Sequence, residues 1–127
     1  MVTYDATTET VRVAVRPAYL DGKSDAVASR FVFAYFVRIE NHGLGDVQLL
    51  RRRWDITDGH GRVETVEGDG VVGARPVIEP GGAHEYQSFC VLTTFEGSMT
   101  GTYLMQREDG SRFRAQIPAF NLVAMSN

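Results

Sequence analysis

Residues 31–40 read FVFAYFVRIE, and apolar side chains recur at every second position of this stretch. In an extended chain, one face would carry Phe31, Phe33, Tyr35, Val37 and Ile39. Toward the end of the stretch, Arg38 and Glu40 fall on the opposite face. Such alternation is typical of a strand in an antiparallel sheet that buries one face and exposes the other to water.

The same period of two recurs on both sides of this stretch. VRVAVRP places Val11, Val13 and Val15 on one face, and SRFRAQIP does the same for Phe113, Ala115 and Ile117. Further strands are predicted over Val47–Thr57, Arg62–Val66, Ala83–Leu92, Gly101–Gln106 and Phe120–Ala124. No segment carries an apolar stripe with helical spacing over three turns, so the sequence predicts an all-β protein.

Turn signals separate the predicted strands. Residues 58–61 (DGHG) and 108–111 (EDGS) each join two strand-like runs and predict hairpins. Seven to eight antiparallel strands in 127 residues predict an immunoglobulin-like β-sandwich of the fibronectin type III kind. We expect one domain over residues 1–127, with the first ten residues loosely held.

Composition favours an ordinary globular protein, with 43% hydrophobic and 23% charged residues. The net charge of −3 gives no general attraction to nucleic acid or to an anionic membrane. The single cysteine, Cys90, excludes an internal disulfide and suits a reducing compartment. The N-terminus lacks the layout of a signal peptide, and no apolar run approaches the ~20 residues that a spanning helix needs. We therefore predict a cytoplasmic location.

The strand LLRRRWDIT, residues 49–57, places an arginine among apolar residues. Arg52 shares a face with Trp54 and Ile56, which are the predicted core residues. One interpretation is that the stem of Arg52 packs while its head reaches solvent or a carboxylate. The other is that Arg52 anchors an anionic ligand or partner. Arg51 and Arg53, on the opposite face, belong to a solvated surface or, together with Arg38, to a basic patch.

The stretch VEGDGVVGAR, residues 66–75, contains a formal G-x-G-x-x-G at Gly68, Gly70 and Gly73. Dinucleotide binding by this motif requires a following helix whose N-terminal amides hold the phosphate. Pro76 and Pro80 follow instead, which argues against a long helix. Two interpretations remain: a structural turn, and a helix-free loop that binds an anion through its amides.

Other chemistry-bearing residues form no recognisable catalytic or metal-binding pattern. Three acids lie close together in Glu64, Glu67 and Asp69, but they match no calcium-binding loop. The histidines are scattered at His42, His60 and His84, without zinc-binding spacing. Ser98 lacks the G-x-S-x-G spacing of a hydrolase nucleophile, and Cys90 lies in a strand-like run. We predict no enzymatic activity, no metal site and no cofactor.

Several stretches, taken in order, resemble one family. They read FVFAYFVRIEN, VQLLRRRWDITDGHG, VEGDGVVGARPVIEPGGAHEYQS, GSMTGTYLM and FRAQIPAFNL. Together they resemble the bacterial ApaG family, a small domain also found within some eukaryotic F-box proteins and a polymerase delta interacting protein. The resemblance runs from about Val11 to Val123, and its most specific marker is the glycine motif followed by RPVIEPG.

This resemblance implies a fibronectin type III-like sandwich and no established enzyme activity. It implies that the glycine motif and the pair Arg52 and Trp54 are family features. Bacterial members are associated genetically with cobalt and magnesium tolerance, and the eukaryotic occurrences suggest a protein-interaction module. Phe89, Phe95 and Asp55 depart from the expected pattern and bear on any surface function near that end of the sandwich.

Two hypotheses of function follow. In the first, the protein is a non-catalytic module that binds an unidentified protein through Arg51, Arg52 and Arg53, through the glycine loop or by pairing of a sheet edge. In the second, the loop Gly68–Gly73 binds a nucleotide, pyrophosphate or a divalent cation. We expect neither nucleic acid nor a membrane as a partner.

Overall fold

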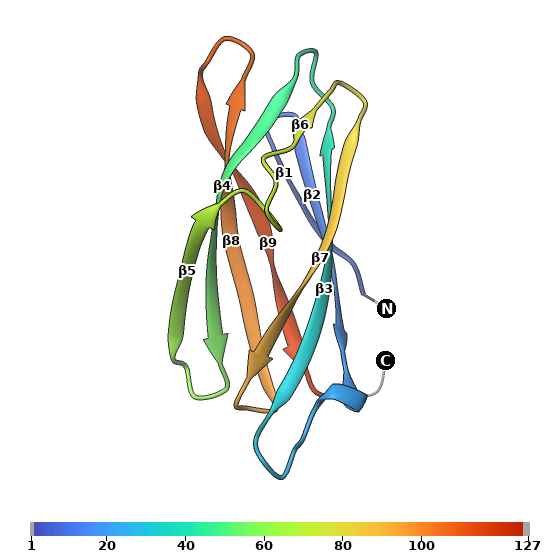
Figure 1. Ribbon diagram of the computed structural model, residues 1–127, viewed down its shortest axis with the longest axis vertical. Helices are drawn as coiled ribbons and strands as arrows, with labels where there is room; N and C mark the ends of the chain where they lie inside the picture. The colour runs from blue at the N-terminus through green and yellow to red at the C-terminus, as the bar shows by residue number, and fades with distance from the viewer. Residues whose placement is uncertain (1, 126–127) are drawn as a thin grey trace.

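The computed structural model describes residues 2–125, which fold into two facing antiparallel sheets (Figure 1). In spatial order, the first sheet contains β1 (Tyr4–Thr8), β2 (Val11–Tyr19), β3 (Phe31–Asn41) and β7 (Ala83–Leu92). The second contains β5 (Val63–Asp69), β4 (Val47–Asp58), β8 (Glu96–Arg107) and β9 (Arg112–Val123). The short β6 (Val77–Ile78) also pairs with β4, and a 3-10 turn η1 (Asp21–Lys23) follows β2. The predicted all-β sandwich is confirmed.

Both predicted hairpins form, between β4 and β5 and between β8 and β9. The last two predicted strands are one strand, β9, because a register shift opposite Met99 and Gly101 absorbs the irregularity at Pro118. Proline has no N–H to donate to the ladder, and a bulge is one of the places where a sheet accepts it. The shift lets β9 continue where the sequence indicated a break.

The expectation that the first ten residues are loosely held is wrong for residues 4–8, while Met1 lies outside the described residues. Tyr4–Thr8 form β1, which pairs along its whole length with β2. The ring of Tyr4 packs 6.1 Å from that of Phe120, centroid to centroid. The Gln116 N–H donates to Thr8 Oγ1 at 2.9 Å. These contacts join β1 to β9 and close one side of the sandwich.

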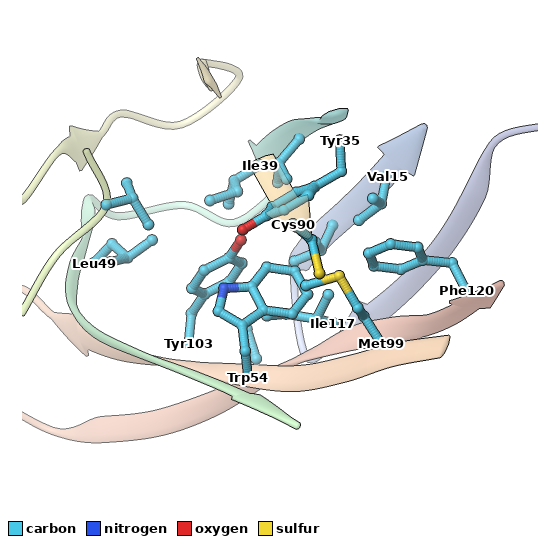
Figure 2. Close-up of a cluster of buried hydrophobic side chains, with 14 of the residues drawn as sticks. Val15, Tyr35, Ile39, Leu49, Trp54, Cys90, Met99, Tyr103, Ile117 and Phe120 are labelled. Atoms are coloured by element: carbon cyan, nitrogen blue, oxygen red, sulfur yellow. The ribbon is translucent and has the colours of Figure 1, made fainter. Parts of the chain in front are cut away.

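The core is centred on Trp54, whose side chain β4 directs between the sheets. Its ring lies 5.1 Å from that of Tyr35 and 5.9 Å from that of Phe120, and Tyr103 contacts it edge-on (Figure 2). Trp54 is only 3% exposed, as predicted, whereas Ile56 is half-buried at the margin of the core. Large aromatic surfaces from both sheets therefore meet at one residue.

An ion-pair network covers one end of the outer face of the first sheet. Glu40 accepts from Arg38 Nε at 2.8 Å and from Arg12 Nη1 at 3.3 Å, and His42 Nε2 lies 2.8 Å from its other oxygen. The hydrogen bonds from Arg38 and His42 lower the pKa of Glu40 from 4.5 to about 2. Arg38 therefore belongs to this network and not to a patch with Arg51 and Arg53.

We predict that Glu40 stabilises the fold in a defined pH window. Because its pKa is lower in the folded protein than in the unfolded chain, its contribution is full above pH 4.5 and disappears as the pH falls towards 2. The difference in free energy of unfolding between the wild type and Glu40→Gln should shrink over that window, as measured by urea unfolding at successive pH values. Glu67→Gln on exposed β5 is the matched control, because it also removes one carboxylate. A difference that stays constant with pH contradicts the prediction.

Candidate functional site

The side of the sandwich opposite β1 and β9 is open, because β7 and β5 are the terminal strands of their sheets there. Each of these two strands pairs along one edge only within the described chain. A cavity of about 230 Å³ lies on this side, lined in part by Tyr35, Arg52, Trp54, Tyr86 and Ser88. The open side therefore combines two free strand edges with a small cavity that reaches towards the core.

Arg52 faces this cavity from β4, as strand alternation predicts. Its Nη1 donates to the backbone carbonyls of Asp69 at 2.8 Å and Gly70 at 3.0 Å. Within residues 2–125, no carboxylate lies at ion-pair distance from its guanidinium. The head of Arg52 is therefore held by neutral acceptors, and its positive charge has no paired anion in the described chain.

Two glycines of the motif make this arrangement possible. Gly68 lies opposite Arg52 on β5, and a Cβ at Gly68 would come within 2.7 Å of Arg52 Nη2. At Gly70, φ is +60° and a Cβ would lie 2.1 Å from the carbonyl oxygen of Ala74. Gly73 also has a positive φ, of +77°, in the tight turn that follows β5. The motif thus makes room for an arginine and for a turn.

The amides of this loop are largely engaged within the protein. The N–H of Gly70 donates to Leu50, and the N–H groups of Val71 and Ala74 each donate to the carbonyl of the other. The carbonyls of Asp69 and Gly70 point instead at Arg52. A loop that offers carbonyls to a cation in this way is arranged unlike a nest of free amides that holds a phosphate. Nucleotide binding by Gly68–Gly73 stays a prediction that this geometry does not favour.

The other two candidate arginines do not join Arg52. Arg51 Nη1 donates to Asp69 at 2.5 Å, and Arg53 lies 3.6 Å from a carboxylate oxygen of Asp55. Both side chains are about half-exposed on the outer face of the second sheet. A register shift between Leu49 and Arg51 lets both leucines of LLRRRW be buried before the alternation resumes. Arg52 therefore lies at the cavity, whereas Arg51 and Arg53 lie on the outer face of the second sheet.

Residue-level reasoning missed Tyr86 and Ser88, which line the cavity from β7. The hydroxyl of Tyr86 hydrogen-bonds that of Tyr103, whose side chain is fully buried. Burial raises the pKa of Tyr86, Tyr103 and Tyr35, so these phenols stay neutral at physiological pH. Alternation in AHEYQSFCVL, which puts Tyr86, Ser88 and Cys90 on one face, was the signal that could have found them.

The described residues offer no assembled catalytic or metal centre. Cys90 is buried, and burial raises the pKa of its thiol to about 11, which keeps it protonated and unreactive. Across residues 2–125, no three His, Cys, Asp or Glu side chains gather to hold a metal ion. No helix in the same range is long and apolar enough to cross a membrane.

Comparison with known proteins now decides the family. A sequence model of the ApaG domain matches residues 21–107. The chain belongs to the ApaG family. An ApaG protein from Paramagnetospirillum magneticum is 54% identical over 119 residues, covering 94% of this chain and 92% of the relative. One from Rhodospirillum centenum is 50% identical over the same shares of both chains.

A solved structure of a similar protein has the same fold. The structure of a protein named ApaA from Bordetella pertussis superposes with a TM-score of 0.87 at 44% identity, covering 89% of this chain and 92% of that one. The resemblance inferred from the glycine motif and its neighbours is thus confirmed. In this ApaG-family chain, the motif includes the glycine that faces Arg52.

We predict that Gly68→Ala destabilises the fold by about 1 kcal/mol, because the new methyl group displaces the guanidinium of Arg52 from the carbonyls of Asp69 and Gly70. Urea unfolding measures the change. Gly22→Ala is the matched control, since a Cβ there meets nothing within 4 Å. In an Arg52→Ala background the cost of Gly68→Ala should fall, because the colliding group is gone. Equal costs in both backgrounds would show that the contact between Gly68 and Arg52 is not the cause.

We also predict that Tyr86→Phe costs about 1–3 kcal/mol, because it leaves the buried hydroxyl of Tyr103 without its partner. Adding Tyr103→Phe should restore part of the loss, since no orphaned hydroxyl then remains. Tyr4→Phe is the control, because no hydrogen bond of the Tyr4 hydroxyl occurs within residues 2–125. Strictly additive costs in the double-mutant cycle would contradict the prediction.

Proposed function

We propose that this ApaG-family protein is a non-catalytic module that binds a partner protein at the free edge of β7. In this mode, an extended segment of the partner adds a strand to the first sheet through main-chain hydrogen bonds. The observation that carries the proposal is a pair of exposed apolar side chains on that edge strand. Phe89 is 52% exposed and Val91 is 49% exposed, and both point outward from β7.

These two side chains lie beside apolar residues of the neighbouring strand. In the register of β3 and β7, Ala34 pairs with Phe89 and Val32 with Val91, and both β3 side chains are buried. Phe36, one step further along β3, is half-buried beneath the guanidinium of Arg16, 4.9 Å from its ring centroid. We call the exposed Phe89 and Val91, together with the half-buried Phe36, the apolar patch. A sheet edge bordered by such a patch is an aggregation hazard unless something covers it.

The absence of an assembled catalytic set in residues 2–125 supports a binding role over an enzymatic one. Cys90 is protonated within the core, and within the described chain Ser98 has no hydrogen bond to a histidine or a carboxylate that could activate it. We further propose that any link to cobalt or magnesium tolerance runs through the partner, because the described residues build no cation site. A cytoplasmic location stays a prediction.

The proposal predicts that charge placed on the apolar patch abolishes partner binding without unfolding the protein. Wild type, Phe89→Lys and Val91→Lys serve as baits in native cell extract, and the retained proteins are quantified. A partner of the wild type should fall at least about tenfold in both variants, since a buried lysine opposes docking. Val2→Lys is the control, because Val2 is 63% exposed and lines the hollow beside β1 and β9, on the opposite side of the sandwich.

A photo-crosslinking residue at position 91 locates the contact. The same partner should be crosslinked there and not from position 114, on the outer face of the second sheet. Retention that is equal in all variants, or crosslinks confined to position 114, would overturn the proposal.

A further inference from the structure

A strand added to β7 would cross the open side of the sandwich. The first sheet ends at β7, and the second ends at β5 on the same side, so an extra strand continues the first sheet over the inner face of β5. Side chains of paired strands that share a face lie about 4.5–5.5 Å apart at Cβ. The inward residues of the added strand would therefore stand beside Tyr86 and Ser88 and face the cavity.

The cavity that these side chains would enter is positively charged. Arg52 is the charged residue in its lining, and the other lining groups are neutral phenols, a hydroxyl, an indole and two valines. The hydrogen bonds of the guanidinium within the described chain come from Nη1, which leaves Nε and Nη2 for a further acceptor. An arginine fork of this kind suits a carboxylate, because two parallel N–H donors match its two oxygens.

We propose that the partner segment carries an aspartate or glutamate at an inward position and that its carboxylate binds Arg52 in this cavity. This inference rests on the proposed binding at β7 and adds the chemistry that selects the partner. The side chain of Ser88, which hydrogen-bonds Tyr35, lies in the same lining. A volume of about 230 Å³ admits one side chain, so the cavity accepts a single acidic residue of the partner segment. The residues on either side of it pair with β7.

The same arrangement accounts for a partly buried cation at the margin of the sandwich. Withdrawing part of a positive charge from water is costly unless the guanidinium has acceptors. Two carbonyls hold Arg52 in place in the free protein, while the paired anion comes with the partner. Arg51 and Arg53 differ from Arg52, because each has a carboxylate partner on the outer face. Asp69 pairs with Arg51, and Asp55 pairs with Arg53.

The test is selection of a random-sequence peptide display library on the folded full chain. Selected peptides should protect the amides of Ala83–Leu92 from hydrogen exchange and should share one Asp or Glu among alternating β-forming residues. For the strongest peptide, changing that residue to Asn or Gln should weaken binding to the wild type at least about tenfold. This arm leaves the protein unchanged, so it does not depend on how a variant folds.

Variants of the protein then test which arginine binds the carboxylate of the peptide. Arg52→Gln should weaken the acidic peptide at least about tenfold and should abolish its advantage over the amide peptide. Arg52→Lys should retain part of the preference, because it keeps the charge but not the fork. Arg53→Gln, one residue away on the outer face, should change nothing. Urea unfolding confirms that each variant is folded.

The outcomes separate this inference from the proposed function. Peptides that protect β7 but show no acidic preference overturn the inference and leave binding at β7 intact. An acidic preference that is lost in Arg53→Gln and kept in Arg52→Gln also overturns it. Peptides that bind without protecting β7, or a library that yields no binder, overturn the proposed function and this inference together.

Discussion

The hydrogen bonds from Arg52 to the carbonyls of Asp69 and Gly70 set the architecture of the open side. Strand alternation that directs Trp54 into the core also directs Arg52 inward, two residues earlier. A guanidinium in that position needs acceptors, and the end of β5 supplies them. The absence of a side chain at Gly68 leaves room for the partly buried guanidinium, whereas Gly70 is required by its φ of +60° and by the close carbonyl of Ala74.

The outer face of the first sheet is divided between two kinds of surface. One end is covered by the network of Glu40 with Arg12, Arg38 and His42, in which charges are mutually satisfied. The other end is the apolar patch, where β7 leaves an edge unpaired within the described chain. Charged side chains on a sheet discourage association, and uncharged exposed ones permit it. The two ends therefore differ in how readily a second chain can approach.

Much of this fold follows from short-range pattern. The alternation of apolar and polar residues predicted the strands, and Asp-Gly pairs predicted two hairpins. Both signals depend only on residues that are close in the sequence. The inward direction of Arg52 was predictable for the same reason. Three features were not predictable: the acceptors of Arg52, the role of Gly68, and the hydrogen bond between Tyr86 and Tyr103. They depend on cross-strand register or on how the two sheets pack against each other. The continuity of β9 was hidden by a bulge, which shifts the period by a residue.

The closed side of the sandwich has a consequence for how the domain can be joined to other sequences. Val2 and Tyr4 line the same hollow as Leu122 and Met125, so the first and last described segments lie together beside β1 and β9. β7 and β5 lie at the opposite ends of their sheets from β1 and β9, the strands beside this seam. A domain or an affinity tag joined beyond either described segment would start from beside β1 and β9 and leave the free edges of β7 and β5 unobstructed. Such geometry suits a unit that is inserted into larger polypeptides while its open side stays accessible.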